Sequence, residues 1–170
     1  MANLTYLSAY NQTVQTQVAE MLARGTLGDW LLSKYPHSHD VRNDNELREY
    51  VQDIKQRYLK KSAPLSKVTY DNKIHVVNHA LGLHTYVTRV QGGKLKSKNE
   101  LRVAAMFKQA PEAFLRMIVV HELAHLKEKD HNKSFYQLCQ HMLPDYHQLE
   151  FETRVYLTYT EQVGPLYQAN

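Results

Sequence analysis

Apolar residues in the first third of the chain recur at the three- and four-residue steps that are typical of amphipathic helices. The first such pattern predicts a helix over Thr13–Arg24, which Gly25 is placed to end. A second, short helix is expected over Leu27–Lys34. A third begins at Asn43 or Asp44, either of which can cap it, and its apolar face consists of Leu47, Tyr50, Val51, Ile54 and Tyr58.

The helical pattern is interrupted at Ser62-Ala63-Pro64, and strand-like patterns follow. A strand is expected over Val68–Tyr70, and a helix from about Ile74 to Leu81. The segments Thr85–Val90 and Leu101–Phe107 each alternate apolar and polar residues, and turn-forming residues lie between them. This arrangement favours an antiparallel hairpin.

A mostly apolar stretch follows Pro111, whose fixed φ and missing amide donor suit the first turn of a helix. The helix predicted over 111–127 is apolar on nearly every side, so we expect it to be packed on several sides. Beyond a polar break, Asn132 or Ser134 can start a further helix, whose Phe135 and Met142 face the core. The sequence therefore predicts an α+β fold with N-terminal helices, a short antiparallel sheet and these two later helices.

The 170 residues and 19.9 kDa fit a single domain over 1–170, with a helical part over 1–62 and a core over 63–170. No segment approaches the roughly 20 apolar residues of a membrane span, and the first residues do not resemble a leader peptide. A single cysteine, Cys139, favours a reducing compartment. We therefore expect a cytoplasmic protein with no membrane partner, and the oligomeric state stays open.

The net charge of +4 and the pI near 9.0 would suit an anionic partner. Lysine and arginine gather in Lys55–Lys61 and in Lys94–Lys98. Neither cluster is interleaved with aromatic residues as in a recognisable nucleic-acid-binding module. Solvated surfaces are the favoured interpretation, and nucleic acid is a weakly supported partner.

The helix predicted over 111–127 carries the pattern His121-Glu122-Leu123-Ala124-His125. Helical residues four apart lie on one face with Cβ atoms about 5–6 Å apart, so both imidazoles can bind one metal ion. Glu122 is rotated by about 100° from His121, and its carboxylate can act as a general base on a water molecule. Zinc would polarise the scissile carbonyl while the carboxylate passes the proton to the leaving amine. The alternative is that these side chains share a helix by chance.

Two residues compete for the place of the third metal ligand. His131 lies ten positions after His121, which is the metzincin spacing, although Glu128 stands where that pattern has a glycine. Glu150 lies 25 positions after His125, near the spacing of zincins that use a glutamate ligand. We favour His131, because a helix that starts directly after it would hold it beside the first two ligands.

The histidine pattern, followed by His131-Asn132-Lys133-Ser134-Phe135-Tyr136, resembles the YgjP-like metallopeptidase family, which is related to the SprT-like zincins. The resemblance covers roughly Thr85–Tyr146 and is most specific over Ile118–Phe135. It implies a small zincin-like fold that binds Zn²⁺. By position, it implies His121, His125 and His131 as metal ligands and Glu122 as the catalytic base.

The leading hypothesis is a zinc-dependent hydrolase, a metallopeptidase that cleaves peptide or protein substrates. A SprT-like protease that acts on DNA-associated proteins is one alternative, which the basic charge would suit. A non-catalytic zinc-stabilised binding module is another, although a structural site would not need Glu122. The remaining histidines of interest are interpreted as ordinary core or surface groups: His37, His39, His75, His79 and His84.

Overall fold

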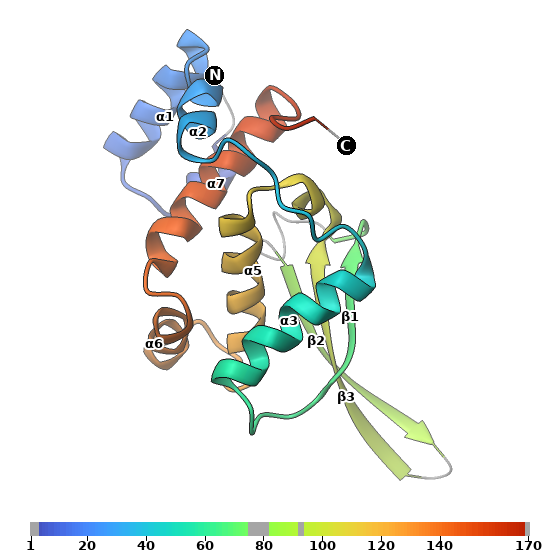
Figure 1. The fold of residues 1–170 in the computed structure, drawn as a ribbon. Helices are drawn as coiled ribbons and strands as arrows, with labels where there is room; N and C mark the ends of the chain where they lie inside the picture. Colours follow the sequence, from blue (N-terminus) through green and yellow to red (C-terminus); the bar gives the residue numbers. More distant parts are fainter. Residues whose placement is uncertain (1–3, 75–81, 92–93, 169–170) are drawn as a thin grey trace.

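The computed structural model describes residues 4–74, 82–91 and 94–168, and it describes side chains only outside 75–98. Figure 1 shows the ribbon. The elements follow in the order η1 (Thr5–Leu7), α1 (Gln12–Arg24), α2 (Leu27–Lys34), α3 (Asp44–Tyr58), β1 (Leu65–Asp71), β2 (Gly82–Gln91), β3 (Lys94–Ala104), η2 (Ala105–Gln109), α5 (Glu112–Ala124), α6 (Lys133–Met142) and α7 (Tyr146–Gln162). The predicted α+β class is confirmed. The helix expected from Ile74 to Leu81 lies outside the described residues, and the division into one domain with two parts stays a prediction.

The three N-terminal helices form where the apolar patterns predict them. The side chains of Asn11 and Asn43 accept the amide N–H groups of Val14 and Glu46 at 2.9 and 2.8 Å, so α1 and α3 both begin with a capping asparagine. Gly25 has φ of 70°, which ends α1. Helices α1 and α2 lie beside one end of α7, away from the sheet (Figure 1).

The sheet has the order β1-β3-β2 and is mixed. Strands β2 and β3 pair antiparallel from Gly82↔Val103 to Gln91↔Lys94, as the hairpin prediction requires. Strand β1 instead pairs parallel with β3, from Leu65↔Asn99 to Asp71↔Ala104, so the prediction of a purely antiparallel sheet was wrong. Two parallel strands are not joined by a local turn, so no local sequence pattern predicts that they pair.

Strand β3 ends before the predicted boundary at Phe107. The chain leaves the sheet after Ala104 and forms the 3-10 helix η2, in which Phe107 is still fully buried. The Phe107 carbonyl accepts a hydrogen bond from His39 Nε2 at 2.6 Å rather than a bond from a neighbouring strand. Phe107 is buried like the apolar residues of β3 before it, so the alternation in the sequence extends past the end of the strand.

Helix α5 lies in the middle of the molecule, with the sheet on one side and α7 on the other (Figure 1). Its residues from Met117 to Ala124 are all buried, which explains why the sequence is apolar nearly all round. Pro111 precedes the helix as its N-cap with ψ of 151°, rather than standing in its first turn. The helix ends at Ala124 and not at Lys127, because the amide groups of Leu126 and Lys127 bond three residues back, to Leu123 and Ala124.

Two helices follow α5, and only the first was predicted. The Asn132 side chain accepts the amide N–H of Phe135 at 2.9 Å and so caps α6 as expected. Helix α7 was missed because its buried face mixes apolar residues with Glu152, Thr153 and Thr158. The two threonine hydroxyls donate to carbonyls one turn earlier in the same helix, which satisfies them in the core.

His39 is a core histidine, as interpreted from the sequence: it is buried, and both ring nitrogens have main-chain partners. The side chains of His75, His79 and His84 lie outside the described residues. None of the described helices combines the length and apolar character needed to cross a membrane.

Candidate metal centre

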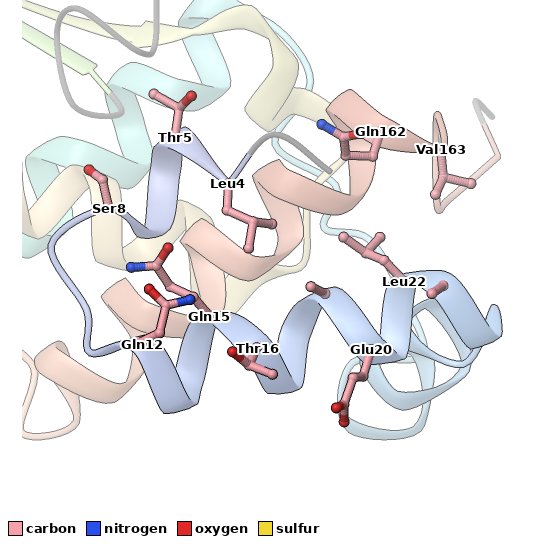
Figure 2. Close-up of a pocket in the computed structure, with 12 residues that line it drawn as sticks. Leu4, Thr5, Ser8, Gln12, Gln15, Thr16, Glu20, Leu22, Gln162 and Val163 are labelled. Atoms are coloured by element: carbon pink, nitrogen blue, oxygen red, sulfur yellow. The ribbon is translucent and has the colours of Figure 1, made fainter. Parts of the chain in front are cut away.

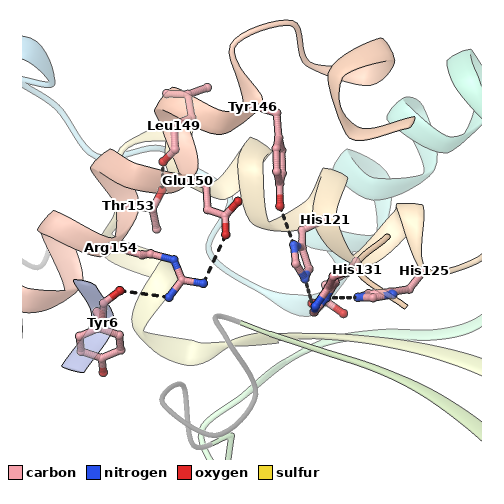
Figure 3. A network of polar contacts seen from close by, with 10 residues as sticks. Tyr6, His121, His125, His131, Tyr146, Leu149, Glu150, Thr153 and Arg154 are labelled. Atoms are coloured by element: carbon pink, nitrogen blue, oxygen red, sulfur yellow. Dashed lines mark hydrogen bonds and ion pairs between the residues drawn. The ribbon is translucent and has the colours of Figure 1, made fainter. Parts of the chain in front are cut away.

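The structure brings His121, His125 and His131 together at the C-terminal end of α5 (Figure 3). One ring nitrogen of each histidine lies within 4.8 Å of those of the other two. The Nε2 atoms of His125 and His131 are 3.1 Å apart. Zinc–nitrogen bonds of about 2.0–2.1 Å in a tetrahedral site place two ligand nitrogens about 3.4 Å apart, which is close to this distance. The three side chains therefore fit a single metal ion.

Hydrogen bonds at Nδ1 orient the two histidines of α5. His125 Nδ1 lies 2.9 Å from the Glu128 carbonyl oxygen, which can only accept, so Nδ1 carries the proton and donates it. His121 Nδ1 lies 2.6 Å from the Tyr146 hydroxyl, and the same tautomer lets it donate there. In both rings Nε2 is then the nitrogen with the lone pair that a metal requires.

The surroundings keep these imidazoles neutral. Burial lowers the pKa of His121 well below its usual value, and the nearby His125 and His131 lower it further. Burial also lowers the pKa of His125, against the opposing effect of its bond to the Glu128 carbonyl. Because only the neutral ring binds a metal, both shifts favour a metal ligand over a charged side chain.

Phe135 holds the three imidazoles in place from the first turn of α6. Its ring centroid lies 5.0 Å from that of His121, 4.6 Å from His125 and 4.9 Å from His131. Phe135 is fully buried, whereas exposure increases from His121 through His125 to His131. The cluster is therefore exposed to solvent on the side of His131.

Glu122 lies next to the cluster and has an unusual environment. Its Oε1 atom is 3.9 Å from His121 Nε2, and the side chain is almost completely buried. Its Oε2 atom has no hydrogen-bond partner, and burial raises the pKa of Glu122 well above its usual value. A buried polar atom without a partner is rare in a folded protein and requires an explanation. A divalent ion with a water molecule beside it would explain both the orphaned oxygen and the converging nitrogens.

Within the described part of the chain, the cluster holds no fourth histidine, cysteine or carboxylate ligand. The structure does not bring Glu150, the competing candidate for the third ligand, into this group. Glu150 lies in α7 and pairs instead with Arg154, at 3.3 Å from Oε1 to Nη2. Three protein ligands leave a coordination position open, which is the pattern of catalytic rather than structural zinc sites.

Tyr146 is the contact that sequence reasoning missed. It begins α7, a helix that was not predicted, and it lies 25 positions after His121. The sequence offers no local signal for such a contact, and Tyr146 is only one of 12 tyrosines.

A separate groove of about 1050 Å³ lies between η1, α1 and the end of α7 (Figure 2). Amide and hydroxyl side chains such as Gln12, Gln15 and Thr16 line it, together with Leu4 and the exposed Val163. Of its described lining residues, Glu20 alone carries a charge. The groove therefore lacks the grouped titratable side chains that the histidine cluster has.

Comparison with known proteins agrees with this location. The model of the family described as "YgjP-like, metallopeptidase domain" matches residues 32–154, a range that contains the histidine cluster and Glu122. A UTP pyrophosphatase of Escherichia coli (strain K12) is 60% identical over 158 residues, which are 93% of this chain and 95% of that protein. No solved structure matches the chain.

Proposed function

Since this chain is a hydrolase that belongs to the YgjP-like family, we propose that it hydrolyses UTP to UMP and pyrophosphate with a bound divalent metal ion. One observation carries the choice of substrate: the 60% identity to a UTP pyrophosphatase extends over nearly the whole of both chains. The histidine cluster and Glu122 support the type of reaction, because they provide a metal site with a base beside it.

We propose that His121, His125 and His131 hold the metal and that the metal is Zn²⁺. Three imidazole ligands with an open position match the preference of zinc in hydrolytic sites. A zinc ion bound there would supply positive charge next to the cleaved bond and lower the pKa of a water molecule towards neutrality.

Glu122 is the general base in this proposal. Its carboxylate takes a proton from the water whose oxygen forms a new bond to the α-phosphorus of UTP. The bond from that phosphorus to the oxygen bridging the α- and β-phosphates breaks, and pyrophosphate leaves with the electron pair. Glu122 then releases the proton to pyrophosphate or to solvent.

Peptide hydrolysis is the second candidate, because the matching family is described as a metallopeptidase domain. The same residues would act in the same order, and Glu122 would pass its proton to the leaving amine. The UTP proposal ranks first because its support covers almost the complete chain, whereas the family description names a domain over residues 32–154. We also propose a cytoplasmic location, which the single, buried and unpaired Cys139 supports.

The decisive experiment supplies zinc-loaded protein with UTP and, separately, with a peptide library. We expect UMP and pyrophosphate in equal amounts, with little peptide cleavage. Glu122→Gln, purified in the same way, shows whether the activity belongs to this site and not to a contaminant. Peptide cleavage that depends on Glu122, without UTP hydrolysis, would reverse the order of the two candidates.

A further inference from the structure

A line of polar side chains connects His121 with α7 and η1 (Figure 3). The Tyr146 hydroxyl lies 2.6 Å from His121 Nδ1. Glu150 lies between Tyr146 and Arg154, and Arg154 donates from Nη2 to Glu150 Oε1 at 3.3 Å. Arg154 Nη1 also donates to the Tyr6 carbonyl at 3.2 Å, which ties this line to the N-terminal segment. The His121 ring is therefore connected to residues well away from the cluster.

The surrounding core fixes the position of the Tyr146 side chain. Its side chain is fully buried, and its ring plane is inclined by only 18° to that of His121, with centroids 6.3 Å apart. A phenol has an ordinary pKa of about 10 and is therefore un-ionised near neutral pH. A neutral phenol can accept from His121 Nδ1–H and direct its own proton towards Glu150.

We propose that Tyr146 is a positioning residue for the metal centre, because it fixes the tautomer and orientation of His121. In the same proposal Glu150, which is held by Arg154, increases the basicity of His121 Nε2, the nitrogen that binds the metal. The inference rests on the proposed function, because it requires that His121 is a ligand. Hydrogen bonds behind ligand histidines commonly tune metal affinity. His125 obtains the same support from the main-chain carbonyl of Glu128, which no side-chain substitution removes.

A chemical argument explains why a phenol, and not a carboxylate, contacts His121 directly. A carboxylate bonded directly to a buried imidazole would favour the protonated ring, which competes with metal binding. With Tyr146 in between, the negative charge of Glu150 polarises the phenol and makes its oxygen a better acceptor for Nδ1–H. His121 gains basicity at Nε2 without a charge next to it.

The test measures zinc affinity by competition with a chromophoric chelator for the full chain and for Tyr146→Phe. We expect the affinity to fall by about 10- to 100-fold, the range for lost partners of ligand histidines. Tyr156→Phe is the matched control, because Tyr156 is a buried tyrosine of the same helix outside this line of contacts, and its zinc affinity should equal that of the parent. The rise in Tm that zinc produces should shrink for Tyr146→Phe alone, and the absorption spectrum of bound Co²⁺ should change for it alone.

The outcomes separate this inference from the proposed function. A parent protein that binds no zinc contradicts the metal centre itself. A parent that binds zinc and a folded Tyr146→Phe that binds it equally well overturn the role of Tyr146 and leave the metal centre intact. If Tyr146→Phe does not fold, Glu150→Gln decides, since it removes the charge and keeps the phenol: weaker zinc binding supports the inference, and unchanged binding overturns it.

Discussion

Two glutamates on neighbouring helices are equally buried but differ in their partners. Glu152 of α7 accepts from Lys34 at 2.6 Å, from the Tyr35 hydroxyl at 3.1 Å and from the Gln148 amide at 3.2 Å. Glu122 of α5 has an oxygen without any partner. Leaving a buried polar group unpaired costs free energy, so a fold retains one only where another requirement outweighs the cost. The partners of a buried carboxylate, and not its burial, separate the stabilising residue from the reactive one.

The buried histidines repeat this contrast. His39 uses both ring nitrogens for main-chain partners, the Phe107 carbonyl and the Val41 amide. His125 uses Nδ1 for the Glu128 carbonyl and His121 uses Nδ1 for the Tyr146 hydroxyl, whereas Nε2 of His125 faces His131 and Nε2 of His121 faces Glu122. A histidine whose two ring nitrogens both have main-chain partners supports the fold, whereas a histidine held through Nδ1 alone keeps Nε2 able to bind a metal ion.

The strongest test of the contrast exchanges the two carboxylates for amides. Glu122→Gln should lower the turnover of UTP by about 10²- to 10⁴-fold, because an amide cannot accept the proton from water. Its zinc content and unfolding midpoint should stay near those of the parent. Glu152→Gln should show the opposite pattern, with turnover kept and stability lost. Steady-state kinetics and urea denaturation of both variants give the comparison, and equal losses of turnover would remove the distinction.

The next test compares the zinc affinity lost with a proposed ligand, His131, with that lost with a second polar residue, Glu150, which does not bind the metal in this proposal. His131→Ala removes a proposed ligand, so its zinc affinity should fall by more than the roughly 100-fold that marks the loss of a supporting group. Glu150→Ala should cost less, because that carboxylate pairs with Arg154. Chelator competition measures both affinities. The reverse order would make Glu150 the ligand and move the chain to the glutamate-ligand zincins.

A third test concerns stability around Glu152. Glu152→Ala leaves the Tyr35 hydroxyl and the Lys34 ammonium without their acceptor. We expect a loss of about 1–3 kcal/mol in the free energy of unfolding, and a modest share from Lys34, which is 39% exposed and screened by solvent. Urea denaturation measures the loss, with the exposed Glu20→Ala as a matched control. Equal stability of the two variants would contradict the role assigned to Glu152.

The smallest expected effect is the pH dependence that His39 contributes. Burial lowers the pKa of His39 in the folded state, so between that value and about 6.5 the unfolded chain binds more protons, and stability is lost as the pH falls. His39→Gln should reduce the loss between pH 7 and pH 5 in metal-free protein, by at most about 1.4 kcal/mol for each pH unit. His121 and His125 contribute a slope of the same sign, which should remain. An unchanged slope in urea titrations would show that His39 is not held neutral.

Local patterns predicted the elements that carry the cluster, and distant contacts decided the rest. The turn at Asn132, the apolar run before His121 and the four-residue spacing to His125 all lie within a short segment, so α5, α6 and the three neighbouring histidines followed from the sequence. The contact of Tyr146 with His121 joins residues 25 positions apart on two helices, and no short segment encodes it.

The histidine pattern also does not identify the substrate. The residues that activate water can be the same for a peptide bond and for a phosphate anhydride, so the motif does not distinguish between these two substrates. The similarity to a UTP pyrophosphatase extends over 93% of the chain, far outside the motif, and it therefore supports the proposed substrate where the motif does not.

Because β3 lies between its two partners, β1 has no place in the sheet until β3 has formed. The hairpin joins Gln91 to Lys94, whereas the parallel pair joins Leu65 to Asn99 and must close a much longer loop. We therefore expect the hairpin to fold first, and β1 to dock later together with α3, which packs on it. In pulse-labelling hydrogen exchange, amides of β2 and β3 should become protected before those of β1, and the opposite order would contradict this sequence of events.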